Sequence, residues 1–138
     1  AHHYADLAEK RGDRGAAIRE LSRITEGARP ELGPEVREVV ADAHSRIAEL
    51  AAAEGDPERA LAEVEAGLAV ATEITPFRGH LFEVRGVIHE QLMRAAEARG
   101  DAAGAEGHRK SALDAFSKAM DVQEQFILES LPSASPPR

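Results

Sequence analysis

The sequence predicts an all-α domain built from antiparallel helix pairs, and three observations point to this fold class. Apolar residues recur every three or four positions over most of the chain, which is the spacing of one face of an α-helix. The dipeptide Gly-Asp recurs three times at nearly even intervals, as expected for bends between helices. The composition is rich in alanine and only 4% aromatic, which suits closely packed helices better than a sheet sandwich.

Each Gly-Asp is interpreted as a hairpin bend, because glycine readily ends one helix and the following Asp caps the next. The bends lie at Gly12-Asp13, Gly55-Asp56 and Gly100-Asp101, and links rich in Pro and Gly separate the pairs. The prediction is six helices, near residues 3–11, 13–27, 34–54, 57–73, 76–99 and 105–129. They form hairpins over 3–27, 34–73 and 76–129 of one domain, 1–131, which a Pro- and Ser-rich tail or linker follows at 132–138.

The apolar periodicity predicts which face of each helix is buried. In the third helix the stripe consists of Val36, Val40, Ala43, Ile47 and Leu50. In the sixth helix it consists of Leu113, Phe116, Met120 and Ile127. Both stripes are expected to face the core.

Length and charge limit the domain organisation and the partners. A chain of 138 residues, 43% of them hydrophobic, is expected to form one core. The net charge of −8 argues against nucleic acid as a partner, because nucleic-acid binding depends on clustered Lys and Arg. No apolar run is long enough to span a membrane, so no membrane partner is expected and the cytoplasm is the default location. The excess of Arg over Lys and the abundance of Ala suggest a bacterial, GC-rich source.

The alternation of small and large residues around the second bend resembles the tetratricopeptide repeat family, with repeats longer than usual for it. The residues that carry the resemblance are Ala48, Gly55, Ala60, Val64, Gly67 and Leu68. In the third hairpin the matching small residues, Gly86 and Ala112, lie about two turns further from the bend on both sides, which predicts one long hairpin in register. The resemblance implies a right-handed α-solenoid of three stacked helix pairs, similar to the scaffold arms of large bacterial regulators.

In such a solenoid the first helix of each pair lines a concave groove that binds a partner protein. By the resemblance, the groove is acidic, which favours a basic or amphipathic peptide or helix as the partner. The expected function is a non-catalytic protein–protein interaction module; the alternative for the acidic side chains is a merely solvated surface. The expected groove residues are Asp6, Glu9, Asp42, Ser45, Glu49, His80, Glu83, Val87, Glu90 and Gln91.

The end of the last helix carries apolar residues on more than one face. These residues either cap the stack by packing on the fifth helix or form a patch for self-association, because no later repeat covers them. Self-association would make the chain a structural or oligomerisation domain, with a homodimer formed through the last helix. The residues concerned are Val122, Phe126, Ile127 and Leu131.

No motif for catalysis or cofactor binding is present in the sequence. The serines lack a nucleophile elbow, and the glycines at 100–107 do not follow a strand as a phosphate loop requires. The histidines lack the spacing of three or four residues that brings metal ligands together on one helix face. His44, His80, His89 and His108 are therefore expected to be structural or solvent-exposed, and no catalytic residue, cofactor or metal is expected.

Overall fold

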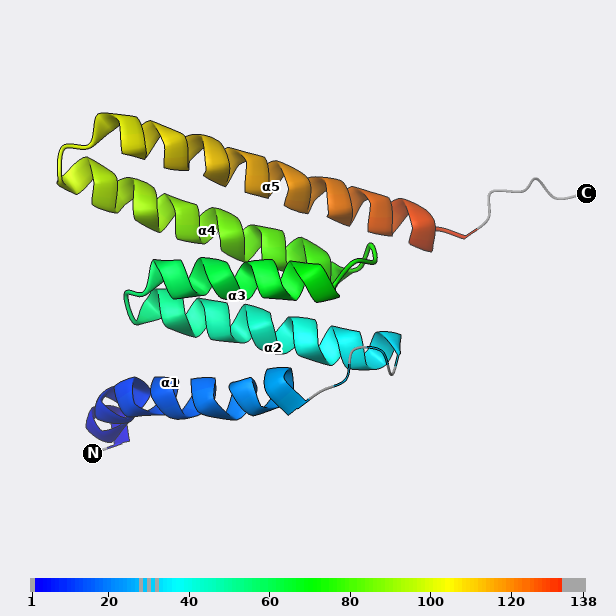
Figure 1. Cartoon of the computed structure of the whole chain (residues 1–138), viewed down its shortest axis with the longest axis horizontal. Coiled ribbons are helices and arrows are strands. Elements are labelled where there is room, and N and C mark those ends of the chain that lie inside the picture. The colour runs from blue at the N-terminus through cyan, green and yellow to red at the C-terminus, as the bar shows by residue number, and fades with distance from the viewer. Residues whose placement is uncertain (1, 28, 30, 32, 133–138) are drawn as a thin grey trace, which may run out of the picture.

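The computed structural model describes residues 2–27, 29, 31 and 33–132, with side chains from Gly12 onward, and it is all-helical. It contains α1 (His2–Gly27), α2 (Pro34–Ala53), α3 (Pro57–Val70), α4 (Pro76–Ala98) and α5 (Ala102–Ser130). No strand occurs within the described ranges, so the all-α prediction is confirmed. The predicted tail falls almost wholly outside the described residues. In Figure 1 the helices lie in chain order across the molecule, from α1 at one side to α5 at the other.

Two of the three predicted Gly-Asp bends are confirmed. Gly55 and Gly100 have φ values of 83° and 78°, the left-handed conformation that reverses the chain after a helix. The following aspartates cap the next helices: Asp56 accepts a hydrogen bond from the Arg59 backbone N–H at 3.2 Å. Asp101 accepts one from the Gly104 N–H at 2.9 Å, so α5 starts at Ala102, three residues earlier than predicted.

The bend predicted at Gly12-Asp13 is wrong, because α1 continues through it without interruption. Gly12 lies in open space and does not adopt a positive φ. A glycine that keeps the right-handed conformation costs a helix only about 1 kcal/mol, so Gly-Asp permits a bend without forcing one. The predicted helices 3–11 and 13–27 are therefore one helix, and the described residues form five helices instead of six.

The remaining helices pack as the predicted hairpins. α2 pairs with α3 over the predicted range 34–73, and α4 pairs with α5 over 76–129 (Figure 1). Between the hairpins, α4 contacts both α3 and α2, while α1 packs on α2. Proline stands at the first helical position of α2, α3 and α4, where its missing N–H costs nothing. The principal core cluster joins these three helices through Ala48, Ala51, Ala60, Val64, Val84 and Ile88.

The stripe predicted for the last helix is wrong for three of its four residues; the fourth, Phe116, is half-buried against α4. Leu113, Met120 and Ile127 are 56%, 69% and 50% exposed. The buried face of α5 consists of smaller side chains, Ala105, Ala112, Ala115, Ala119 and Val122. The small residue at the Phe116 contact lies on α4 instead: a Cβ added at Gly86 would lie 2.6 Å from the Phe116 ring. In α2 the predicted stripe is buried at Val40, Ala43 and Ile47.

Candidate functional site

A groove runs between α2 and α4, and we call it the α2–α4 groove. Its cavity measures about 530 Å³. Helical spacing on α4 places side chains along one wall, because residues three or four apart share a face. The lining residues are Glu49, Ala52, Ala53, His80, Glu83, Val84, Val87, Ile88, Gln91 and Arg94.

The charge of the side chains that line the groove changes from one end to the other. At one end His80 Nε2 lies 2.9 Å from Glu49 Oε1 across the groove, and His80 Nδ1 lies 3.7 Å from Glu83 Oε2 on its own helix. The middle is apolar, formed by Val84, Val87 and Ile88. At the other end the Gln91 amide donates to the Ala52 carbonyl at 3.1 Å, beside Arg94. The groove therefore offers an acidic rim, an apolar floor and one cationic end.

The structure brings five of the ten predicted groove residues together: Glu49, His80, Glu83, Val87 and Gln91. Asp42 and Glu90 do not line the cavity; Asp42 pairs with Arg46 at 2.9 Å, and Glu90 lies 3.8 Å from Arg94. The prediction for Ser45 is wrong, because this side chain is only 2% exposed and donates to the Asp42 carbonyl. Asp6 and Glu9 lie in α1 outside the described side chains.

Sequence reasoning missed four lining residues: Ala53, Val84, Ile88 and Arg94. Arg94 could have been found, because it follows Gln91 by three positions on the same helix face. Val84 and Ile88 had been interpreted only as core residues. Both belong to the core: Val84 shows a small edge at the groove floor, whereas Ile88 is fully buried beneath it.

The residues predicted for self-association occupy different environments. Val122 is buried with Phe82 and Ala119, so its assignment to a free patch is wrong and its role is to cap the fold. Phe126 is half-buried and lines a second cavity of about 390 Å³, which shares His80 and Glu83 with the α2–α4 groove. Ile127 and Leu131 are exposed. With Leu113, Met120 and Leu128 they form what we call the outer stripe of α5.

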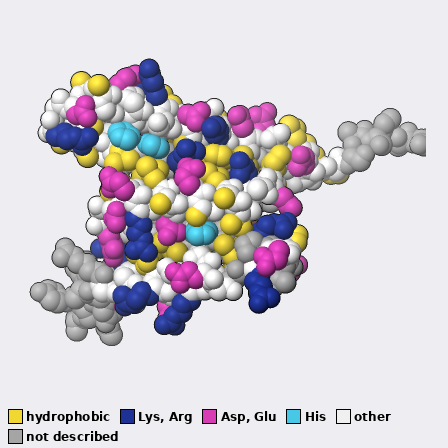
Figure 2. Space-filling model, in the orientation of Figure 1, with side chains coloured by type: hydrophobic (Ala, Val, Ile, Leu, Met, Phe, Trp, Pro, Cys, Tyr) yellow, Lys and Arg dark blue, Asp and Glu magenta, His cyan; other side chains and the backbone are white. Residues whose placement is uncertain are grey.

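Each of the other described histidines from His44 onward lies at an interface between two helices and contacts a side chain of the neighbouring helix. His44 Nδ1 lies 2.7 Å from Glu63 Oε2 between α2 and α3. His89 Nδ1 lies 3.1 Å from His108 Nδ1 between α4 and α5, and Figure 2 shows two adjacent histidine side chains at this hairpin. Burial lowers the pKa of His89, as do the charges of His108 and Arg85, against a smaller opposing effect of Glu65. His89 is therefore uncharged at neutral pH.

The described part of the chain contains no group of three or more His, Cys, Asp or Glu side chains placed to hold a metal ion. No serine lines the α2–α4 groove. The fold and the groove define a class: an all-helical domain of packed hairpins with a groove between α2 and α4. No protein-family model, curated protein or solved structure matches the chain. None of the described helices combines the length and apolar character needed to cross a bilayer.

Proposed function

We propose that the chain is a non-catalytic protein-binding module whose α2–α4 groove binds a basic, amphipathic helix of a partner. The observation that carries this proposal is the cavity of about 530 Å³ with an apolar floor and two carboxylates at its rim. We further propose that the hairpins stack as a right-handed, tetratricopeptide-like solenoid, and that the module serves a larger cytoplasmic regulatory or scaffold protein in a bacterium. The contact of α4 with both α2 and α3 supports the stacking.

The chemistry of the groove fits an amphipathic helix. Such a helix presents apolar side chains at intervals of three or four residues, and these can rest on the exposed Val87 and on the edge of Val84. A Lys or Arg on the flank of the same helix reaches Glu49 and Glu83, where it competes with His80 for the carboxylates. A purely acidic peptide would meet repulsion at this rim.

The proposal is tested with two designed helical peptides that share one leucine pattern, one carrying Lys and the other Glu at its polar positions. Titration calorimetry is expected to show binding of the Lys peptide alone. Charge reversal by Glu49→Lys with Glu83→Lys is expected to weaken binding of the Lys peptide by about tenfold or more. The two carboxylates that attract the lysines of the peptide are then replaced by ammonium groups that repel them.

The matched control is Glu54→Lys with Glu97→Lys, which makes the same change in net charge at exposed positions outside the groove. Binding by this control is expected to stay within about threefold of the native protein at 0.15 M salt, where distant charges are screened. Equal weakening in both double variants would mean that the peptide responds to net charge and not to the groove.

A second function, homodimer formation through the outer stripe of α5, is favoured by a separate observation. Leu113, Met120 and Ile127 are seven residues apart, so they form a straight exposed seam of the kind that pairs helices. In an antiparallel pair of copies, Leu113 of one copy faces Ile127 of the other, with Met120 at the axis. Met120→Glu with Ile127→Glu is expected to convert a dimer to a monomer in sedimentation equilibrium. A native chain that stays monomeric at high micromolar concentration would contradict this function.

A further inference from the structure

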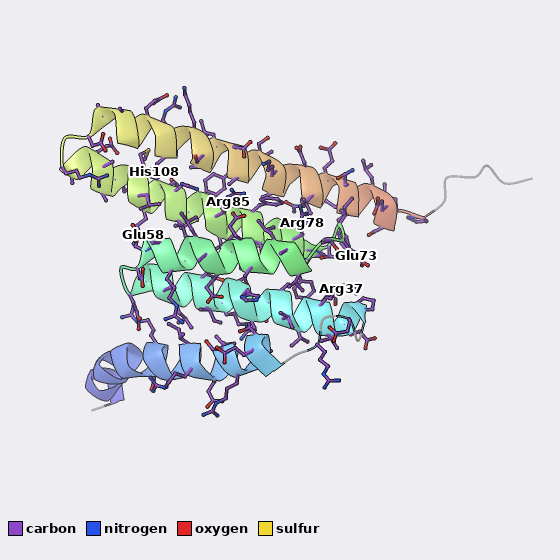
Figure 3. All side chains as sticks on the ribbon, viewed as in Figure 1. Arg37, Glu58, Glu73, Arg78, Arg85 and His108 are labelled. Atoms are coloured by element: carbon purple, nitrogen blue, oxygen red, sulfur yellow. The ribbon has the colours of Figure 1, made fainter. Side chains whose placement is uncertain are left out.

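The imidazoles of His89 and His108 come from neighbouring helices and meet at the α4–α5 interface. Their Nδ1 atoms are 3.1 Å apart, and their ring centroids are 5.3 Å apart with the planes tilted by 31°. Figure 3 labels His108 near the bend end of this hairpin, with Arg85 further along α4. The Gly100 bend and the small-residue face of α5 hold the two helices close together, so the pair is held by a tightly packed hairpin.

We propose that His89 and His108 together form a binding site for a divalent transition-metal ion, with Cu²⁺ as the preferred ion. Metal–imidazole bonds of about 2.0–2.1 Å place two ligand nitrogens about 2.9 Å apart at a right angle and about 3.4 Å apart at a tetrahedral angle. The observed 3.1 Å lies between these values. A metal ion can therefore bridge the two Nδ1 atoms after small rotations of the rings.

The protonation state of the pair suits metal binding. A hydrogen bond between two Nδ1 atoms requires a proton on one of them and a free lone pair on the other. When the metal binds, the proton of the donor ring moves to Nε2 of the same ring, so two neutral imidazoles coordinate without net loss of a proton.

The charged groups around the pair leave the site open to a cation. Arg85 of α4 pairs with Glu65 of α3, with its guanidinium 3.2 Å from the carboxylate, so its positive charge is partly offset at the histidine pair. No third ligand of the described chain joins the two histidines, so water completes the coordination shell. The affinity of a site with two imidazole ligands follows the general order for divalent ions, in which Cu²⁺ binds more tightly than Ni²⁺ or Zn²⁺.

The test uses CuCl₂ and the full chain in a background carrying His2→Ala and His3→Ala, so that the N-terminal histidines do not compete. Calorimetry is expected to show one Cu²⁺ per chain, and electron paramagnetic resonance is expected to show two nitrogen ligands. Bound Cu²⁺ is expected to raise the Tm by several degrees, because it links α4 to α5 in the folded state only.

Single variants decide the assignment. His89→Ala and His108→Ala are each expected to abolish binding, whereas His80→Ala, on the same helix beside Glu49 and Glu83, is expected to leave it unchanged. If an alanine variant loses helix content, His89→Gln and His108→Gln replace it, since Gln fills similar space and still hydrogen-bonds. Full binding by either variant, or an equal loss with His80→Ala, would overturn the proposal.

Discussion

Replacing Leu81 by Ala is expected to lower the free energy of unfolding by about 2–5 kcal/mol, the range for removing a large aliphatic side chain from a packed core. Leu81 is fully buried on α4 with Ala41 of α2 and Ala71 beyond the end of α3. Its Cδ2 atom would lie 2.8 Å from a Cβ added at Gly67, so α3 and α4 meet at this leucine. Urea unfolding followed by circular dichroism at 222 nm measures the change.

The control for this prediction is Val39→Ala on α2. Val39 is 55% exposed, so its truncation is expected to change stability by no more than about 0.5 kcal/mol. A small effect of Leu81→Ala, comparable to that of Val39→Ala, would contradict the packing of α4 against α2 and α3.

Gly86→Val is expected to lower the free energy of unfolding by about 1–3 kcal/mol, the usual cost of overpacking. A Cβ at Gly86 would lie 2.6–2.8 Å from three ring atoms of Phe116, so either the ring or α5 must move. This expected loss exceeds the gain from replacing a helical glycine, which is a few tenths of a kcal/mol for valine. The same unfolding experiment detects it, together with a change in the near-ultraviolet signal of phenylalanine.

Two further variants separate overpacking from a general effect of valine. Gly107→Val on α5 has open space around the new Cβ and is expected to be neutral or slightly stabilising. Combining Gly86→Val with Phe116→Leu is expected to recover part of the lost stability, because the two positions share one contact. Additive losses in the double variant would mean that the residues do not touch.

The sequence predicted those parts of the fold that depend on local chemistry. The Asp56 and Asp101 caps, the helix-starting prolines and the register of the long hairpin are all determined within a few residues or one helix pair. The errors arose where tertiary packing decides. Gly12 can bend the chain or remain helical. On α5 the alanines are buried while Met120 is exposed, because the packing of α4 decides which face of α5 is covered.

Only half of the residues predicted for the groove line it, for a similar reason. Helical spacing along α4 identifies His80, Glu83, Val87 and Gln91 as one face, and this face lines the cavity. On α2 the spacing did not separate buried Ser45 from exposed Glu49, because that distinction depends on how the neighbouring helices pack. The His89–His108 pair could not be recognised by searching single helix faces, since its members lie nineteen residues apart on two helices.

The floor of the groove is also part of the hydrophobic core. Val84 and Ile88 fill the space between α2, α3 and α4 and also border the α2–α4 groove. A substitution that reshapes the floor therefore loosens the fold as well. For the proposed binding module we therefore expect that substitutions at the rim, at Glu49, Glu83 and Arg94, alter partner choice with the least loss of stability, because these side chains lie outside the core cluster.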